Sequence, residues 1–473
     1  MMTIPQKKQK VWKMKRISII LGKEMVEVNL PDNTEILSTE QPKSLANPAF
    51  SIQKALKDSI SSRSLEQIIE QKLEKNPQAK AVIVISDNTR PVPYQGKAGI
   101  LWPIIEKLLA KNISNDHILI LVATGTHRPL SEKDLRGMLD PRVFYNKIPI
   151  KNHDCRDQNN LAYLGKTSRG SSVYINGDYM EADIKILTGL VETHFMAGAS
   201  GGRKSICPGL IGEESIYIFH GAPMLASQEA SDLIIDGNPC HQEALEVAKK
   251  AGADYILNVT LDQDFKLTGV FAGDLEEAHK KAVKQIKKYV AIPLDKEYDI
   301  VITHASFVGI NQYQTAKAAV AAIPVLKTNG KLIMIANNDD EDLIGSEKYK
   351  TVLHLLKIIG AKQFNRLILS PDWTFIPDQW QVQMWTRLFS KISPENFIYY
   401  SPRLSFNDYK IIPGVDGNIF LPRAERYKDN LKNAAQVIEK AVEAAIYELK
   451  SAGQEKIRIA YLADGPYGVP IRS

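Results

Sequence analysis

One local pattern recurs along the chain: a short run of apolar residues, a polar loop, and then a segment with helical periodicity. The apolar runs are AVIVIS (81–86), ILILVA (118–123), DIKILTG (183–189), YDIVIT (298–303) and KLIMIA (331–336). Strands that alternate with helices are typical of parallel sheets covered by helices. We therefore expect an α/β protein with two α/β domains, mostly parallel sheets, and an interdomain active-site cleft.

The length of 473 residues allows two or three domains, each with its own core. A lysine-rich helical segment ends near residue 290, and a new β-rich unit follows it. We expect an N-terminal α/β domain over 1–290, beginning with a hairpin around Gly22-Lys23, and a C-terminal α/β domain over 296–425. Residues 426–473 should supply a helix, expected from residue 425 to 451, and a strand that pack back near the domain junction.

Composition excludes several classes of protein. The three cysteines form no C-x-x-C pair, which argues against a disulfide framework or a zinc ribbon and for a reducing compartment. No stretch approaches 18 uninterrupted apolar residues, and the basic N-terminus lacks the apolar core of a signal peptide. The net charge of +6 comes from lysines that are not interleaved with aromatic residues. We expect a cytoplasmic protein that binds neither nucleic acid nor membrane.

Unusual polar clusters follow three of the expected strands. They are DNTRP (87–91), GTHRP (125–129) and the segment from ETH to GGRKS (192–205). Ligands of open α/β sheets bind outside the carboxyl ends of the strands. The three clusters are therefore expected to form one site.

Two of these clusters contain residues suited to acid–base chemistry and anion binding. The guanidinium of Arg90 suits a carboxylate or a phosphate, although Asp87 and Thr89 are also ordinary helix-capping residues. His127 and His194 follow neighbouring strands, and two imidazoles could take a proton on one face of a substrate and return it on the other. A turn histidine held by its own backbone is the alternative for His127.

The third cluster is a near match to a nucleotide-binding P-loop. Arg203 occupies the position of the last glycine, and Pro208 would interrupt the helix that should follow. We expect the loop to bind a phosphate through Gly198, Gly201, Gly202 and Ser205. Lys204 is held in a turn, where lysines often act as nucleophiles.

His220 has no partner at the spacing of a metal-binding motif, so it could complete a metal site only with ligands from a cofactor. In the second unit, Gln314 and Lys317 lie one turn apart at the start of a helix, next to Tyr313. Trp380 could close an apolar wall. Ordinary helix surface and core packing are the alternatives for these four residues.

The motifs together carry a resemblance. They are DNTRP, GTHRP, ETHFMAGASGGRKSICPG (192–209), His220, YQTAK (313–317), DQWQVQ (378–383) and DGPYGVP (464–470). In this order and spacing, the chain resembles the nickel-dependent lactate racemase family over nearly its whole length. The resemblance implies an isomerase, a racemase or C2-epimerase of a 2-hydroxy acid that uses proton-coupled hydride transfer.

The resemblance also implies a cofactor. Family members carry nickel in a pyridinium-3,5-bisthiocarboxylic acid mononucleotide, which grips the metal through two sulfurs and a ring carbon. Lys204 matches the lysine that tethers it through a thioamide, and His220 matches the remaining nickel ligand. The glycine loop would hold the mononucleotide phosphate, and separate cofactor-synthesis proteins would be partners.

The family's proton-transfer histidines match His127 and His194. By the same resemblance, Arg90 would grip the substrate carboxylate with help from Gln314 and Lys317. Asp87 would orient Arg90 or contact the cofactor ribose, and the pocket lining would be Tyr313 and Trp380.

Two departures leave the substrate open. Ala197 stands where relatives often carry a hydroxyl, and FVGINQYQ lacks a Pro-x-Asp lead-in. The family includes epimerases of larger 2-hydroxy acids, including sugar acids. The alternatives are a P-loop-like kinase or ATPase that uses Gly198–Ser205, and a cofactor-binding member with different chemistry.

Overall fold

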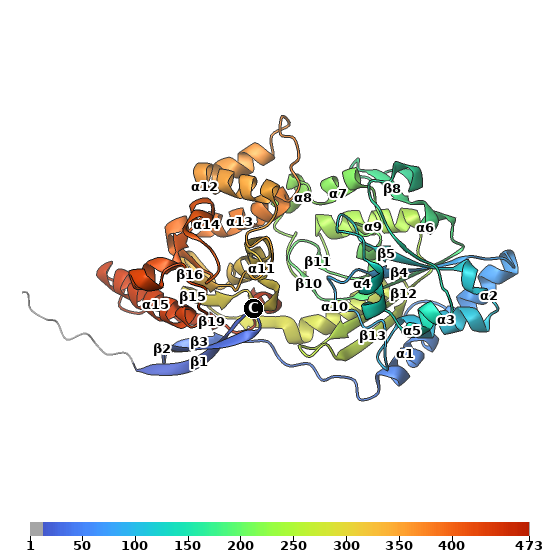
Figure 1. Ribbon diagram of the computed structural model, residues 1–473, viewed down its shortest axis with the longest axis horizontal. Coiled ribbons are helices and arrows are strands. Elements are labelled where there is room, and N and C mark those ends of the chain that lie inside the picture. Colours follow the sequence, from blue (N-terminus) through green and yellow to red (C-terminus); the bar gives the residue numbers. More distant parts are fainter. Residues whose placement is uncertain (1–12, 473) are drawn as a thin grey trace, which may run out of the picture. The chain divides into compact units, whose positions relative to one another are not determined.

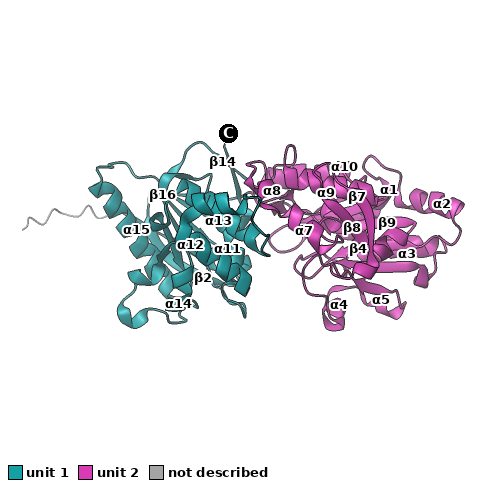
Figure 2. Ribbon diagram, turned by 90° about the horizontal axis from the view of Figure 1, so that it is seen from above, with its two compact units in different colours: residues 1–39, 291–473 teal, residues 40–290 magenta. Residues whose placement is uncertain are grey.

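The computed structural model describes residues 13–472. These residues form two compact units: one comprises residues 40–290, and the other joins the chain before residue 40 to the chain from residue 291 onward (Figure 2). The expected N-terminal domain of 1–290 therefore differs from the observed unit in its first 39 residues. The cause is strand β3 (Thr34–Leu37), which pairs in parallel with β19 (Ile459–Leu462) of the other unit.

The unit of residues 40–290 is built on a six-stranded sheet with the order β13-β12-β9-β4-β5-β6. All neighbours are parallel except β12 and β13, which are antiparallel. The strands are β4 (Ala81–Ser86), β5 (Ile118–Ala123), β6 (Ile150–Asn152), β9 (Ile184–Leu190), β12 (Tyr255–Leu261) and β13 (Leu267–Gly273). The two strands expected at 81–86 and 118–123 are confirmed residue for residue.

Helices cover both faces of this sheet. Residues 81–85 of β4 are all buried, so side chains on both sides of the strand lie in the core. Figure 1 shows the helices around the sheet. They are α1 (Pro48–Lys57), α2 (Leu65–Lys75), α3 (Leu101–Ala110), α4 (Glu132–Met138), α5 (Pro141–Tyr145), α6 (Gly177–Glu181), α7 (Glu213–Phe219), α8 (Ala222–Ala226), α9 (Pro239–Ala251) and α10 (Glu277–Val290).

Two small antiparallel pairs complete this unit. They are β7 (Leu161–Lys166) with β8 (Ser172–Asn176), and β10 (Thr193–His194) with β11 (Gly198–Ala199). The second pair leaves the carboxyl end of β9 and leads into a short 3₁₀ turn, Gly202–Ser205. The glycine-rich loop is thus attached directly to a central strand.

The other unit has a six-stranded parallel sheet with the order β18-β17-β16-β15-β19-β3. The remaining strands of this sheet are β15 (Tyr298–His304), β16 (Leu326–Ile335), β17 (Phe397–Tyr400) and β18 (Val415–Asp416). The expected hairpin around Gly22-Lys23 is confirmed as β1 (Met14–Leu21) and β2 (Glu24–Pro31). A further parallel pair joins β14 (Ala291–Leu294) to β20 (Val469–Arg472).

The helices of this unit are α11 (Gln312–Ala322), α12 (Glu347–Ile368), α13 (Gln379–Lys391), α14 (Phe406–Ile411) and α15 (Asn433–Ser451). Helix α12 is broken at Gly360, whose φ is 75°. The expected helix over 425–451 begins later, at Asn433, and Tyr427 has a left-handed φ of 58° that a helix does not contain. Its expected apolar stripe from Ala434 to Ala445 is buried.

Residues 426–473 are an integral part of this unit and not an appendage. Strand β19 lies inside the sheet, between β15 and β3. Helix α15 packs on β2, β15, β16 and β17. Within residues 13–472, no helix combines the length and the apolar character needed to cross a lipid bilayer.

Candidate active site

Three loops meet at the carboxyl edge of the sheet in the unit of residues 40–290. Strand β4 lies between β5 and β9, so the segments after residues 86, 123 and 190 are neighbours. A backbone hydrogen bond from Gly125 N to Gly209 O (3.1 Å) ties the GTHRP loop to the end of the glycine-rich loop. The structure thus brings together the polar clusters that the sequence placed in one site.

His127 is held by Asp87. The Nδ1 atom of His127 lies 2.5 Å from Oδ2 of Asp87, and Oδ1 of the same carboxylate accepts hydrogen bonds from the Thr89 amide (3.1 Å) and hydroxyl (2.5 Å). Burial opposes ionisation of Asp87, but the hydrogen bonds from His127 and Thr89 outweigh it and lower its pKa. An ionised carboxylate can only accept, so His127 donates through Nδ1, and the neutral form of this ring has its lone pair on Nε2.

This contact differs from one expected role of Asp87, the orientation of Arg90. Its carboxylate contacts His127 and Thr89, whereas Arg90 forms an ion pair with Glu192, in which Nε and Oε1 lie 3.2 Å apart. Both partners of that ion pair are about one-third exposed, so the guanidinium stays accessible to an anion. Sequence reasoning did not anticipate Glu192 as this partner.

His194 is oriented by the backbone. It lies in β10, and its Nδ1 accepts hydrogen bonds from the amides of Met196 (3.3 Å) and Ala197 (3.2 Å). Backbone amides can only donate, so Nδ1 is unprotonated and the neutral ring carries its proton on Nε2. His127 and His194 are thus held in opposite tautomers.

The glycines of the loop are required by protein packing. A Cβ on Gly198 would lie 2.1 Å from the Ile234 carbonyl oxygen, and one on Gly201 would lie 2.7 Å from Val191. A Cβ on Gly202 would lie 2.9 Å from the His279 ring. All three glycines also have positive φ values, between 53° and 77°. These glycines bring the loop against its neighbours in the same unit.

Several donors of the loop are already used inside the protein. The Gly202 amide donates to Asn258 Oδ1 (2.9 Å), and the Lys204 amide donates to Gly201 O (3.1 Å). The single hydroxyl proton of Ser205 goes to Thr188 O (3.0 Å), so this hydroxyl has no second proton for a phosphate.

The local geometry also contradicts the P-loop alternative. The turn Gly202–Ser205 has only four residues, and the next helix, α7, does not begin until Glu213. A P-loop would open a long helix directly after the lysine. The loop is therefore a packed turn that presents Lys204.

Lys204 and His220 are desolvated and close enough to interact electrostatically. Burial first, and then the charges of Arg90 and Arg203, lower the pKa of Lys204 to about 7. Burial and the charge of Lys204 lower the pKa of His220 to about 3. The Nζ atom of Lys204 lies 5.9 Å from the ring centroid of Phe219, the residue before His220.

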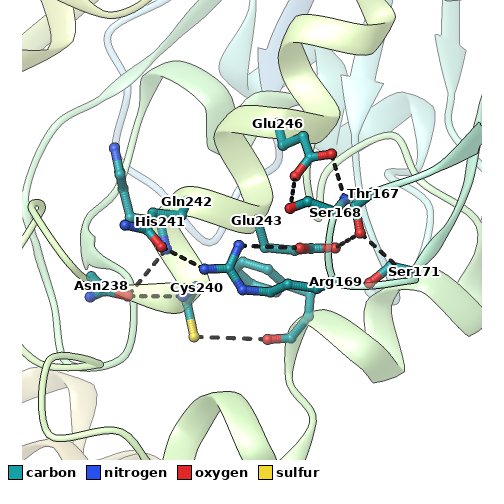
Figure 3. A network of polar contacts seen from close by, with 11 residues as sticks. Thr167, Ser168, Arg169, Ser171, Asn238, Cys240, His241, Gln242, Glu243 and Glu246 are labelled. Atoms are coloured by element: carbon teal, nitrogen blue, oxygen red, sulfur yellow. Dashed lines mark hydrogen bonds and ion pairs between the residues drawn. The ribbon is translucent and has the colours of Figure 1, made fainter.

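Helix α9 packs on the turn Gly202–Ser205, and Figure 3 shows the polar contacts around the first half of this helix. The buried Asn238 caps this helix by accepting from the Cys240 and His241 amides (3.0 and 3.1 Å). Its amide nitrogen donates to Met196 O (3.0 Å). Further along the helix, the buried Glu243 accepts from Thr167 (2.9 Å). The loop that orients His194 is thus joined to the start of α9.

The remaining expected site residues lie in the other unit. Trp380 is buried and donates through Nε1 to the hydroxyl of Tyr313 (2.8 Å), so the two expected lining residues contact each other. Burial, with the charge of Asp378, raises the pKa of Tyr313. Gln314 and Lys317 are half-buried and lie three residues apart on α11.

Sequence reasoning missed Asn258 and gave no role to His279, which both pack against the glycine loop. Asn258 could have been found from its context, since it is a polar residue in the middle of the apolar strand YILNVTL. His279 gave no such signal, because it lies in an amphipathic lysine-rich helix. Within residues 13–472, no three His, Cys, Asp or Glu side chains are grouped so that they could hold a metal ion.

Two protein-family models match the chain. The model described as the lactate racemase N-terminal domain matches residues 21–232. The model described as the lactate racemase C-terminal domain matches residues 294–446. Together they span well over half of the chain.

Individual relatives and solved structures agree with this match. A lactate racemase of Lactiplantibacillus plantarum is 33% identical over 339 residues, which are 71% of this chain and 76% of that protein. One of Thermoanaerobacterium thermosaccharolyticum is 30% identical over 381 residues, 79% of this chain and 86% of that protein. The structure of the lactate racemase apoprotein from the latter organism matches with a TM-score of 0.80 and 25% identity, covering 97% of this chain and 100% of that one. A Thermotoga maritima protein matches in fold, with a TM-score of 0.55 and 14% identity over 88% of this chain and 100% of its own.

Proposed function

The chain belongs to the lactate racemase family and is an isomerase, and on that premise we propose that it interconverts the configurations at C2 of a 2-hydroxy acid by proton-coupled hydride transfer. The substrate class follows from the family and from the anion-binding and acid–base groups at the sheet edge. The departures at Ala197 and in FVGINQYQ keep the class at 2-hydroxy acids, not lactate alone.

Lys204 and His220 fit the attachment of a nickel-bearing pyridinium mononucleotide. A desolvated amine with a pKa of about 7 has a lone pair near neutral pH, as covalent attachment requires. A neutral imidazole is the form that binds a metal, and burial keeps His220 neutral. When bound, the group supplies an acceptor for the C2 hydride.

His127 is the proton acceptor best supported by the geometry. Its Nε2 lone pair can accept the substrate hydroxyl proton, and the Asp87 carboxylate stabilises the imidazolium that results. His194, with its proton on Nε2, would donate a hydrogen bond to the substrate oxygen on the other side. The two histidines would thus share the transfer of the hydroxyl proton.

Arg90 would bind the substrate carboxylate, since its fork-shaped guanidinium matches that group and is only weakly committed to Glu192. Gln314 and Lys317 would add hydrogen bonds to the substrate, and the Tyr313–Trp380 pair would line its apolar side. The phosphate of the mononucleotide would contact the loop of Gly198, Gly201, Gly202 and Ser205 through donors other than the Ser205 hydroxyl proton.

We further infer that separate cofactor-synthesis proteins supply the mononucleotide. The cytoplasm would be the compartment, because Cys155, Cys207 and Cys240 are buried thiols that form no disulfide.

One observation carries the proposal. His127, which is hydrogen-bonded to the Asp87 carboxylate, and the desolvated Lys204 both lie in loops at the same sheet edge. The chain should be produced together with the cofactor-synthesis enzymes, and its intact mass measured. We expect a sulfur- and nickel-containing adduct that is absent from Lys204→Arg. The loaded protein should then destroy the optical purity of a 2-hydroxy acid, whereas His127→Ala and His194→Ala should not.

Two outcomes would contradict this proposal. ATP binding without an adduct would return the chain to the nucleotide-dependent alternative. An adduct without loss of optical purity in any of a panel of 2-hydroxy acids would indicate a family member with different chemistry.

A further inference from the structure

Arg203 is a buried guanidinium inside the glycine-rich loop, at the position where a P-loop has its last glycine. Its side chain is 1% exposed. It donates through Nη2 to Ala197 O (2.8 Å) and through Nη1 to Gly201 O (3.2 Å). Nη1 also lies 2.9 Å from Nε2 of His279, an atom that is 2.9 Å from the Ser200 carbonyl oxygen as well. The side chain of Arg203 is therefore buried and held by hydrogen bonds to the loop, whereas most arginine side chains are solvated.

These hydrogen bonds fasten both ends of the turn that carries the site. Ala197, whose carbonyl accepts from Arg203, also donates its amide to His194. Gly201, the second acceptor, precedes the 3₁₀ turn that contains Lys204 and accepts the Lys204 amide. One guanidinium thus connects the backbone that orients His194 with the backbone that presents Lys204.

The partners of Arg203 do not neutralise its charge. They are two carbonyl oxygens and an imidazole, and burial together with the nearby Arg203 charge keeps the pKa of His279 well below its usual range. In the part of the chain that the structure describes, no carboxylate forms an ion pair with Arg203. Its Nε is also buried without a hydrogen-bond partner. Burial lowers the pKa of Arg203 to about 9, so it is still a cation at neutral pH. Burying an unpaired charge costs several kcal/mol, and such a cost points to a functional requirement.

The charge acts on the neighbouring amine. Besides burial, the charged groups that lower the pKa of Lys204 are Arg90 and Arg203. The thiols of Cys240 and Cys207 act in the opposite direction only when ionised, and burial raises the pKa of Cys207. Arg90 has Glu192 as its counter-ion, which leaves Arg203 as the nearby cation whose charge is not offset.

The other titratable groups on the helices near the loop do not offset the positive charge of Arg203. His241 on α9 and His220 after α7 both have pKa values lowered to about 3, so both are neutral near pH 7. The carboxylate of Glu243 on α9 is engaged by Thr167 and lies 3.9 Å from Arg169.

We propose that Arg203 is a positioning residue whose buried, unneutralised charge, together with desolvation and Arg90, favours the uncharged form of the Lys204 amine at neutral pH. The inference rests on the proposed function in one respect, the use of that amine. Thioamide formation joins the amine nitrogen to the carbon of a thiocarboxyl arm and releases one water, so the nitrogen must bring its lone pair. Arg203 replaces the P-loop glycine because this loop has to activate its lysine.

The test measures the Lys204 amine in the chain produced without cofactor-synthesis proteins. Trinitrobenzenesulfonate forms a bond between the amine nitrogen and its ring carbon, while sulfite leaves with the bonding electrons and the amine releases a proton. The rate of labelling of the Lys204 peptide, followed by mass spectrometry from pH 5.5 to 10.5, reports the fraction of free amine. We expect a midpoint near 7 in the unmodified chain.

Two variants separate charge from hydrogen bonding. Arg203→Met removes both, and Arg203→Gln removes the charge but keeps an amide donor. Each should raise the midpoint by about one unit or more, which lowers labelling at pH 7 about fivefold or more. Arg142→Met, which removes an arginine paired with Asp140 in the same unit, should leave the midpoint unchanged.

The inference fails if the unmodified chain already shows the midpoint of an ordinary lysine, near 10.4. That result needs no variant and holds even if both Arg203 variants misfold. It also fails if Arg203→Gln keeps the native midpoint while Arg203→Met shifts it, because hydrogen bonding would then be sufficient. Since no cofactor or racemase assay enters, its failure and that of the proposed function are distinguishable.

Discussion

The carboxylate of Asp87 and the imidazole of His127 meet across two neighbouring strands, with Oδ2 and Nδ1 2.5 Å apart. The register makes the meeting possible: Ser86, the last residue of β4, pairs with Ala123, the last residue of β5, so the loops that carry the two side chains start side by side. In this contact Nδ1 of His127 is the hydrogen-bond donor, so Nε2 is the ring nitrogen that can accept a proton.

Removing the charge of Asp87 should therefore impair the reaction more than it impairs the fold. In Asp87→Asn, the amide no longer stabilises an imidazolium and can turn its NH₂ group toward Nδ1, which would favour the wrong tautomer. We expect kcat of the cofactor-loaded enzyme to fall by about 10²- to 10⁴-fold. Thr89→Ala removes another contact of the same carboxylate and should cost far less, about tenfold at most. Equal activity of Asp87→Asn and the native enzyme would exclude His127 as the proton acceptor.

The two histidines should show opposite tautomers before any cofactor is bound. In two-bond ¹H–¹⁵N spectra of histidine-labelled protein at pH 8, His127 should have its proton on Nδ1 and His194 on Nε2. The signals can be assigned through His127→Gln and His194→Gln. In Asp87→Asn, the His127 pattern alone should change. A proton on Nδ1 of His194 would contradict the orientation that the Met196 and Ala197 amides impose.

Much of the fold follows from local sequence. AVIVIS and ILILVA become β4 and β5 because their uninterrupted apolar residues suit strands that are covered on both faces. The strand ends also located the candidate site, since parallel strands present all their carboxyl ends at one edge.

Strand pairings between segments that lie far apart in the sequence could not be predicted from local sequence. No local pattern in TEIL (34–37) says that it joins β19, which lies more than 400 residues later, so the first residues were given to the wrong unit. The same holds for side chains: Asp87 was placed at the site, but its partner depends on how two loops pack. The glycines of the loop pointed to a phosphate, whereas their close neighbours are Ile234, Val191 and His279.

Stability should fall on mild acidification because of buried neutral histidines. Burial, and then the charge of Arg203, lower the pKa of His241 to about 3, against about 6.5 in the unfolded chain. The unfolded state therefore binds more protons below pH 6.5, and stability is complete above that value and lost as the pH falls toward 3. Between pH 7.5 and 5, this histidine alone should lower the free energy of unfolding by about 2 kcal/mol.

Urea denaturation at pH 7.5, 6.5, 5.5 and 5.0 measures this effect in a range where carboxylates stay ionised. His241→Gln should reduce the slope of stability against pH. The exposed His354→Gln is the control and should not change the slope. An unchanged slope in His241→Gln would mean that His241 takes up its proton as easily when folded as when unfolded.

Close packing of the glycine loop predicts a difference between two glycine substitutions. Gly198 and Gly252 have nearly the same φ, 77° and 74°. A Cβ at Gly198 would lie 2.1 Å from Ile234 O, whereas one at Gly252 would meet nothing within 4 Å. Gly252 has a ψ of 141°, a combination with positive φ that essentially only glycine adopts, so Gly252→Ala should cost only this backbone strain, about 1–3 kcal/mol. Gly198→Ala should cost clearly more and should also displace the backbone between His194 and Lys204.

Thermal or urea unfolding gives the two costs, and trinitrobenzenesulfonate labelling of Lys204 reports the loop itself. We expect Gly198→Ala to change the labelling profile and Gly252→Ala to leave it unchanged. If both variants lose the same stability and label alike, the approach of Gly198 to Ile234 does not hold the loop. The left-handed conformation alone would then account for the glycine at 198.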